Sequence, residues 1–213
     1  MFRVVSAVLA LVFFWVSQPA YAVEPVETYP KTFREDCRNG NAKLYDECGD
    51  QFEILRLATA AAEKEHKVLV VSYGAEWCIW CHAFDAHLKG QYGMFYYDVE
   101  DFPHIMRESL DAREVELASR TNAYAAANII VAHIDSRYAP NGEDVLRALG
   151  AEWQAGDGIP FIFSVRDGRF VAETRWSSQD FPIEKRRNGD SPYRGFNRQL
   201  LLEDLERVVN AAR

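Results

Sequence analysis

The chain has 213 residues, of which 48% are hydrophobic and 26% are charged, and its 32 acidic residues against 24 lysines and arginines give a formal net charge of −8 at pH 7. This acidic balance, with no long basic block, argues against nucleic acid or an anionic membrane surface as the main partner. A chain of this length can bury about 70% of the surface exposed on unfolding. We therefore expect one domain with elaborations, in which the cysteines do not substitute for a core.

Residues 1–22 have the pattern of a secretory signal peptide. Arg3 provides positive charge, Val4–Val16 is an almost unbroken apolar run, and Ala20-Tyr21-Ala22 places small residues around a cleavage point. The run is shorter than the roughly 20 residues that cross a bilayer, and an uncleaved N-terminal anchor is the alternative. We expect export across the inner membrane, a location in the bacterial periplasm and no membrane span after cleavage.

The leader, defined as residues 23–49, has two prolines and no clear hydrophobic period, which predicts irregular structure. Ten residues separate its two cysteines, Cys37 and Cys48. In an oxidising compartment the default for such a pair is a structural disulfide, worth about 3 kcal/mol through its restriction of the unfolded chain. A second redox pair that relays electrons to the other two cysteines is the alternative.

Residues 50–73 predict a helix followed by a buried strand. Asp50 and Glu53 stand at capping-box spacing and begin a helix that runs towards Lys64. The continuous apolar run Val68–Tyr73 is typical of a strand buried on both faces. The expected apolar stripe of the helix consists of Phe52, Leu55, Ala58 and Ala62.

The segment Trp77-Cys78-Ile79-Trp80-Cys81 follows this strand and indicates the chemistry of the chain. A thiol on the first turn of a helix faces unpaired backbone N–H groups and the positive end of the helix dipole. Both favour the thiolate, which is the species that attacks disulfides. The spacing lets Cys81 reach Cys78 within one turn, so a mixed disulfide at Cys78 can be resolved inside the molecule. We therefore expect a redox-active pair.

The helix that begins at this motif continues through Phe84 and Leu88, which we expect to be buried while the first turn stays at the surface. The stretch Gly90–Gly93 ends it. An inserted helical segment is expected at about residues 90–127, because Pro103 can open a helix and an alanine-rich run follows.

A second strand and a hairpin are expected after this insertion. Asn128–Asp135 predicts a buried strand, and Glu143–Leu149 predicts a short helix. Asp167-Gly168 is the strongest short signal for a type I′ turn, here between strands at Phe161–Val165 and Arg169–Trp176.

The last part of the chain is interpreted as a polar loop at Phe181–Gly195 and an amphipathic helix. A crossover connection followed by a tight hairpin predicts an α/β fold with a mixed sheet, covered by helices on both faces. The apolar face of the final helix is expected to consist of Leu201, Leu205, Val208 and Ala212.

This order of elements resembles the thioredoxin superfamily, with Ala75-Glu76-Trp77-Cys78-Ile79-Trp80-Cys81 after the first buried strand and Ile159-Pro160 before the hairpin. The resemblance covers about residues 51–213 without the inserted segment, and it implies one thioredoxin-like domain over residues 50–213. It also implies a cis bond before Pro160, beside the active disulfide, with Ile159 offering a backbone edge to the substrate chain. Trp77 is expected to help position substrate; packing against the domain is the alternative for Trp77 and Trp80.

The chain departs from that family at positions that tune redox chemistry. Thioredoxins place a buried aspartate six residues before the first cysteine, where it helps proton transfer to the resolving thiol, and this chain has Ser72 there. Ile79-Trp80 replaces the dipeptides of typical reductases and strong oxidants, so the direction of electron flow stays open. Glu76 would oppose thiolate formation and a protonated His82 would assist it, with ordinary solvation as the alternative for both.

The expected function is an extracytoplasmic thiol-disulfide oxidoreductase that acts on protein disulfides through Cys78 and Cys81. Reduction is slightly favoured over oxidation on resemblance alone. No cofactor is expected, but a redox partner must recharge the pair.

Three other functions stay open. The string from Cys78 to His82 also fits c-type haem attachment. The two cysteines with His82 and His87 could handle copper or zinc, whereas in an oxidoreductase His87 is expected to be a surface histidine. The third alternative is a thioredoxin-like binding module with a purely structural cysteine pair.

Overall fold

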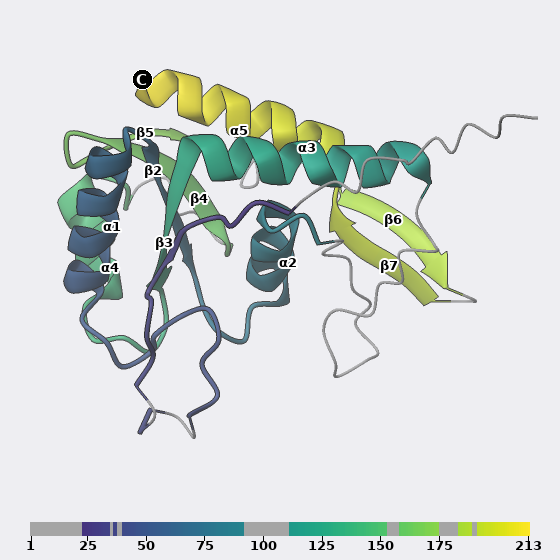
Figure 1. Ribbon diagram of the computed structural model, residues 1–213. Helices are drawn as coiled ribbons and strands as arrows, with labels where there is room; N and C mark the ends of the chain where they lie inside the picture. Colours follow the sequence, from purple (N-terminus) through teal and green to yellow (C-terminus); the bar gives the residue numbers. More distant parts are fainter. Residues whose placement is uncertain are drawn as a thin grey trace, which may run out of the picture.

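The computed structural model describes residues 23–34, 36–37, 40–91, 111–152, 158–174, 183–188 and 191–213, with backbone alone for 183–188 and 191–194. Within this part, a five-stranded sheet has the strand order β1-β3-β2-β4-β5 (Figure 1). The parallel strands are β1 (Thr28–Tyr29), β3 (Ile129–Asp135) and β2 (Val68–Gly74). The antiparallel strands β4 (Phe161–Arg166) and β5 (Arg169–Glu173) complete the predicted mixed sheet.

The central strands β2 and β3 are buried along their whole length. Their apolar, largely β-branched residues suit strands that are covered on both faces. Leu69 of β2 belongs to the core on one side of the sheet and Val70 to the core on the other. Since side chains alternate along a strand, Ser72 points to the same side as Val70. The register pairs Ser72 with His133 of β3, which brings two polar side chains together on that side.

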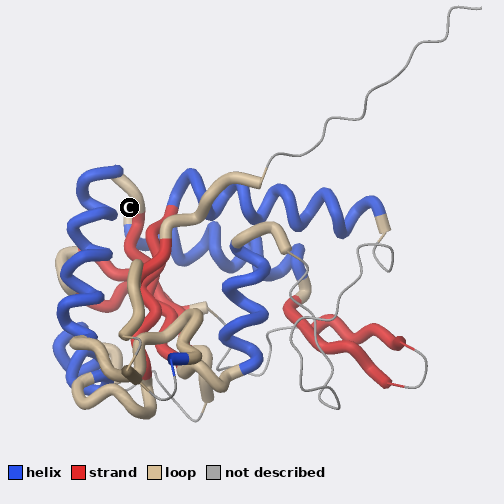
Figure 2. The backbone as a smooth tube through the Cα atoms, turned by 60° about the horizontal axis from the view of Figure 1, so that its bottom comes forward, coloured by secondary structure: helices blue, strands red, loops and turns tan. Residues whose placement is uncertain are grey.

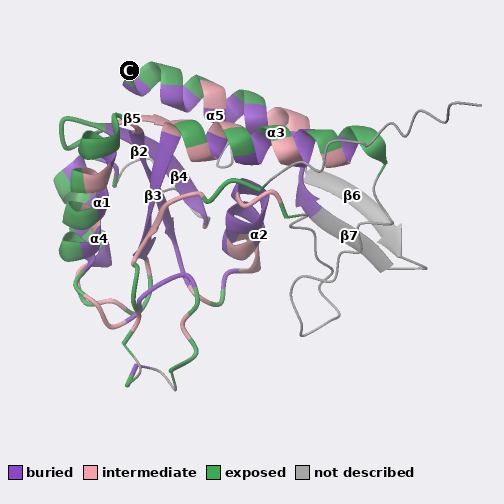
Figure 3. Ribbon diagram, in the orientation of Figure 1, coloured by how far each residue is buried: buried purple, intermediate pink, exposed green. Residues whose placement is uncertain are grey.

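Helices cover both faces of the sheet, as predicted (Figures 1 and 2). On one face α1 (Gln51–Glu65) and α4 (Gly142–Leu149) bury apolar side chains against the strands. The other face is covered by α2 (Ile79–Leu88), α3 (Ala112–Asn128) and α5 (Arg198–Ala212). Buried residues follow the inward sides of both layers (Figure 3). The expected thioredoxin-like α/β architecture is confirmed.

The helix α1 begins where predicted, but one residue of its predicted apolar stripe is wrong. The carboxylate of Asp50 accepts a hydrogen bond from the backbone N–H of Phe52, whereas Glu53 bonds the guanidinium of Arg56. Phe52 itself is 40% exposed, because it lies two positions before Ile54, the first residue of the row that α1 buries. That row, at i, i+4 and i+8, consists of Ile54, Ala58 and Ala62.

The helices α2 and α5 bury the residues that the sequence assigns to the core. Phe84 and Leu88 of α2 are fully buried, and the helix ends before Gly90, which has a φ of 68°. The apolar face of α5 is confirmed at Leu201, Leu205, Val208 and Ala212.

The predicted hairpin between β4 and β5 is confirmed. Asp167 and Gly168 both have positive φ angles, 52° and 69°, as a type I′ turn requires. β5 ends at Glu173, so Thr174 does not belong to the strand as predicted, and residues 175–176 of the predicted strand lie outside the described residues.

The prediction of a polar loop at residues 181–195 is wrong. β6 (Ile183–Asn188) and β7 (Ser191–Phe196) pair antiparallel in a sheet of their own. A hairpin that does not join the main sheet needs none of the apolar alternation of a core strand. The dipeptide Asn188-Gly189 is a strong hairpin signal in the sequence and could have indicated it.

The leader is less irregular than predicted. Its residues Thr28 and Tyr29 form β1, which pairs with Val131 and Ala132 at the edge of β3. The backbone of Glu24 donates to and accepts from the side-chain amide of Asn122 in α3. These contacts satisfy backbone groups of the leader that would otherwise need water.

The helix α3 confirms helical structure in the second half of the predicted insertion. Asp111 and Glu114 form a reciprocal capping box at its start. Pro103 and the predicted signal peptide at residues 1–22 lie outside the described residues. Across the described ranges, no helix combines the length and apolar character needed to cross a bilayer.

Candidate functional site

Cys78 and Cys81 lie where β2 gives way to α2. The N–H of Cys78 donates to the carbonyl of Ala75 at 3.0 Å, and Cys78 then becomes the N-cap of α2. Its Sγ accepts a hydrogen bond from the backbone N–H of Cys81 at 3.2 Å. The two residues form a disulfide, with their Cα atoms 5.2 Å apart. On reduction, a sulfur in this position has both a backbone donor and the helix dipole to stabilise its negative charge.

The motif is more buried than the sequence predicts. Cys78 is 4% exposed and Cys81 is 0% exposed, although the first turn of α2 was expected at the surface. The cysteines pack in a small cluster with Leu44 and Tyr45 of the leader and with Ala75. Residues of the leader therefore cover the site, which no local pattern in the sequence indicates. Of the two cysteines, only Cys78 retains any exposure.

The two tryptophans of the motif have different environments. Trp77 is 62% exposed, which contradicts the alternative that it packs against the domain. Trp80 is half-buried, and its ring meets that of Phe196 edge-on with centroids 5.6 Å apart. Only Trp77 of the two is therefore available as a large apolar contact surface beside Cys78.

The bond between Ile159 and Pro160 is cis, as the resemblance implies. Ile159 packs against the cluster that contains both cysteines, which places this loop next to the disulfide. On the other side of Ile159 lies an open cleft of about 760 Å³. Its walls include Tyr73, Trp77, Tyr138 and Ile159 together with the charged side chains of Arg137 and Glu143. The three residues predicted to position substrate thus lie at or beside one cleft edge.

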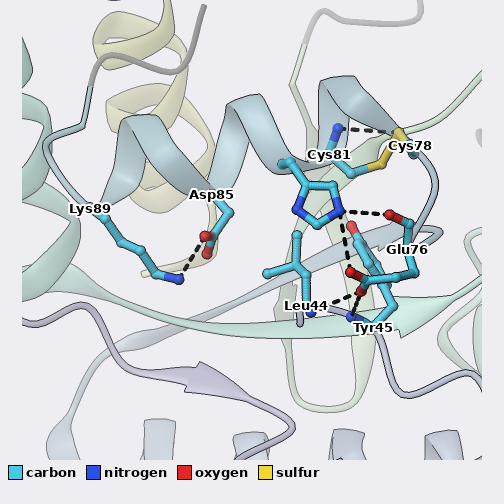
Figure 4. A network of polar contacts seen from close by, with 8 residues as sticks. Leu44, Tyr45, Glu76, Cys78, Cys81, Asp85 and Lys89 are labelled. Atoms are coloured by element: carbon cyan, nitrogen blue, oxygen red, sulfur yellow. Dashed lines mark hydrogen bonds and ion pairs between the residues drawn. A yellow bond between two sulfur atoms is a disulfide. The ribbon is translucent and has the colours of Figure 1, made fainter. Parts of the chain in front are cut away.

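Glu76 connects the motif to the leader (Figure 4). Its Oε2 accepts hydrogen bonds from the backbone N–H groups of Leu44 and Tyr45, each at 2.9 Å. Its backbone carbonyl lies 2.6 Å from Nε2 of His82, and Oε1 lies 3.5 Å from the same nitrogen. Glu76 and His82 are therefore fixed parts of the site rather than solvated groups on its rim.

The predicted disulfide between Cys37 and Cys48 is confirmed, with a Cα–Cα distance of 5.9 Å. Asp46 stands two residues before Cys48, and its Oδ1 accepts hydrogen bonds from the backbone N–H groups of Cys48 and Gly49. The loop that this disulfide closes contains Leu44 and Tyr45. The bond therefore holds the segment that covers the Cys78–Cys81 disulfide.

Buried polar side chains lie near the disulfide on the α2 side of the sheet. Ser72 shares a 3.0 Å hydrogen bond with the hydroxyl of Tyr45. Next to Ser72, His133 lies 3.6 Å from Asp85, which accepts a 2.6 Å hydrogen bond from Lys89. None of these groups except Ser72 could be assigned to the site from the sequence, because their chain positions share no local spacing.

Burial and neighbouring charges together set the protonation of His133 and Asp85 in this cluster. Burial lowers the pKa of His133, and the neighbouring carboxylate of Asp85 only partly opposes this, so the ring is neutral at pH 7. Burial would raise the pKa of Asp85, but His133 and Lys89 outweigh it and lower that pKa. The site thus contains a neutral imidazole and a charged carboxylate.

The expectation of a surface position for His87 is wrong. His87 is 1% exposed and meets the ring of Phe196 edge-on, with centroids 5.7 Å apart. Burial, assisted by the charge of Arg198, holds its pKa well below the ordinary value of 6.5. α2 is covered by β7 as well as by the sheet, so a position that would face solvent on a surface helix is enclosed. Among the described side chains, no group of three His, Cys, Asp or Glu residues is arranged to hold a metal ion.

A scan against protein-family models finds no match to this chain, and a search of curated proteins finds no relative.

Proposed function

We propose that this protein is an extracytoplasmic thiol-disulfide oxidoreductase of the thioredoxin superfamily that acts on protein disulfides. The observation that carries the proposal is the bond between Cys78 and Cys81 at the first turn of α2, where the sulfur of Cys78 accepts a backbone hydrogen bond. A pair with this geometry can alternate between dithiol and disulfide without a change of backbone.

In the reducing direction, the thiolate of Cys78 attacks one sulfur of the substrate disulfide. A bond forms between Cys78 and that sulfur, and the other substrate sulfur leaves as a thiolate and takes up a proton. Cys81 then loses its proton and attacks the sulfur of Cys78, which releases the second substrate thiol. Two electrons have passed from the cysteine pair to the substrate, and the Cys78–Cys81 disulfide remains. Oxidation of a substrate dithiol is the reverse sequence.

The surroundings of Cys78 support a polypeptide substrate. Exposed Trp77 and the loop at Ile159-Pro160 flank the disulfide, and the adjoining cleft has aromatic and charged walls. Aromatic side chains bind chain segments of varied sequence through apolar contact. No cofactor takes part, but a second redox protein must restore the pair after each turnover. We propose the bacterial periplasm as the location and reduction as the favoured direction.

The test is the reduction of a two-chain protein substrate joined by disulfides, with dithiothreitol as the electron source. Cys78→Ser should reduce the catalysed rate to that of dithiothreitol alone. Cys81→Ser, which differs only in the sulfur that is lost, should accumulate a mixed disulfide at Cys78 that mass spectrometry can locate. A Cys78→Ser protein that is as active as the wild type would refute the assignment.

A further inference from the structure

The hydroxyl of Tyr45 and the sulfur of Cys81 face the same point above Gly74. A methyl group at the Cα of Gly74 would lie 2.5 Å from the Tyr45 hydroxyl oxygen and 2.6 Å from Sγ of Cys81. The two atoms are therefore no further apart than the sum of these distances, about 5 Å. Only a glycine at this position leaves the space between them open.

The Tyr45 hydroxyl is enclosed by protein and has one polar partner among the described residues. Tyr45 is 0% exposed, and its hydroxyl shares a hydrogen bond with Ser72, which is also fully buried. Either oxygen can act as the donor in this bond. When Ser72 donates, the proton of Tyr45 is free to point towards Cys81.

A phenol in this environment keeps its proton. Burial raises the pKa of Tyr45 far above its ordinary value, against the smaller opposing effect of Ser72, and the negative charges of Asp85, Glu76 and Asp135 raise it further. Tyr45 is therefore a hydrogen-bond donor at every pH at which disulfide exchange takes place, and it does not act as a base.

We propose that Tyr45, a residue of the leader, donates a hydrogen bond to the thiolate of Cys81 and so stabilises the resolving sulfur. The inference rests on the proposed function, because it concerns the step in which Cys81 attacks the mixed disulfide at Cys78. In that step the S–S bond between Cys78 and the substrate breaks, the Cys78–Cys81 bond forms, and the proton lost by Cys81 is taken up through water by the departing substrate sulfur. Tyr45 keeps its own proton throughout.

Two carboxylates near Cys81 disfavour its thiolate, and a hydrogen-bond donor opposes their effect. Asp85 lies one helical turn beyond Cys81 in α2, and Glu76 lies in the preceding loop, so both carboxylates oppose a second negative charge. His133 on β3 meets Tyr45 edge-on with ring centroids 5.2 Å apart and is neutral at pH 7, so it does not offset them. Lys89 bonds Asp85 at 2.6 Å and His82 contacts Glu76, so each carboxylate is offset only by a partner of its own. A neutral donor lowers the pKa of the thiol without adding a charge that would need its own partner.

The first experiment is a pH titration of Cys81 in Cys78→Ser protein, in which Cys81 is the single thiol when the Cys37–Cys48 disulfide is intact. Thiolate formation is followed by its ultraviolet absorbance, with and without Tyr45→Phe. Loss of the hydroxyl should raise the pKa of Cys81 by about one unit, the shift expected from a hydrogen bond to a charged group. Tyr29→Phe removes a half-buried hydroxyl with a 2.8 Å bond to Glu27 from a residue that packs on the α1 side of the sheet, and should leave that pKa unchanged.

A second measurement keeps the shape of the side chain. A fluorinated tyrosine at position 45 is a stronger donor and should shift the pKa of Cys81 downwards, opposite to Tyr45→Phe. If neither replacement moves the pKa, or if Tyr29→Phe moves it equally, the proposal is wrong.

A third measurement separates this proposal from the proposed function. Reduced protein is mixed with a small aromatic disulfide, and release of the second aromatic thiol reports the attack by Cys81. Tyr45→Phe should slow this second phase about three- to fourfold at a pH below the pKa of Cys81, because the tenfold loss of thiolate is partly offset by its higher nucleophilicity, while the first phase, at Cys78, is unchanged. The measurement needs no protein substrate, so absence of activity on protein disulfides would refute the proposed function alone, and equal second phases would refute the role of Tyr45 alone.

Discussion

Tyr45 and Glu76 lie 31 residues apart in the chain and are joined by a 2.9 Å hydrogen bond from the Tyr45 backbone N–H to the Glu76 carboxylate. Glu76 stands two residues before Cys78, so this bond ties the leader directly to the segment that holds the Cys78–Cys81 disulfide. The leader is therefore part of the site and not an appendage before the domain.

Replacing Glu76 with Ala should destabilise the protein by about 2 to 4 kcal/mol, because two backbone N–H groups lose a charged acceptor. Glu76→Gln keeps an acceptor oxygen at the same place and should recover at least half of that loss. Denaturant unfolding of the three proteins at one pH measures both values. Equal losses in the two variants would show that the carboxylate position does not hold the leader.

Removing the leader disulfide by Cys37→Ala with Cys48→Ala should lower the free energy of unfolding by about 3 kcal/mol, through the greater freedom of the unfolded chain. Disulfide exchange at Cys78 should persist, because the active pair needs no electrons from the leader. Unfolding and exchange are measured on the same preparation below the lower melting temperature. Complete loss of exchange in the folded double variant would instead favour the relay between the two pairs.

Gly74→Ala should destabilise the protein by about 1 to 3 kcal/mol, because the added methyl group meets the Tyr45 hydroxyl and the Cys81 sulfur in a packed core. In the Tyr45→Phe background the same change should cost less, since the nearest clashing atom, the hydroxyl oxygen at 2.5 Å, is absent, while Cζ of residue 45 at 2.9 Å and the Cys81 sulfur remain. A double-mutant cycle of unfolding free energies measures this coupling. Strict additivity would contradict the close approach of the three residues.

The stability of the protein should fall as the pH decreases below 6.5. His87 has a folded-state pKa well below 6.5, so between those two values the unfolded chain binds a proton that the folded protein excludes. The free energy of unfolding should then decrease by up to about 1.4 kcal/mol per pH unit for this group, and above pH 6.5 the group contributes no slope. His133, whose pKa is also lowered, adds to the effect.

His87→Leu provides the control for this pH dependence. The variant should show a shallower slope than the wild type when denaturant unfolding is compared at pH 7.5 and pH 5.5. Identical slopes would mean that burial of His87 does not determine the dependence.

The strands and helices that hold the active pair could be predicted because their signals are local. The apolar run at Val68–Tyr73, the spacing of Cys78 and Cys81, and the Asp167-Gly168 turn each specify their structure within a few residues. The position of Ile159-Pro160 beside the motif followed from the resemblance to a known fold.

The rest of the site depends on contacts between distant segments. Tyr45, His87 and His133 are polar or amphipathic residues with no distinctive spacing, and their burial is decided by which elements pack over them. Phe52 was assigned to the core because it is apolar, yet the rotation of α1 on the sheet exposes it. The hairpin of β6 and β7 was not predicted, because apolar and polar residues do not alternate along its two strands.

The most direct test of the nucleophile is the pH dependence of Cys78 alkylation in the reduced protein, with the modified residue located by mass spectrometry. The N-cap position and the backbone donor should hold the pKa of the Cys78 thiol below about 8.5, the value of an ordinary cysteine, with Cys78 modified before Cys81. A pKa at or above that value, or earlier modification of Cys81, would contradict the assignment of Cys78 as the attacking sulfur.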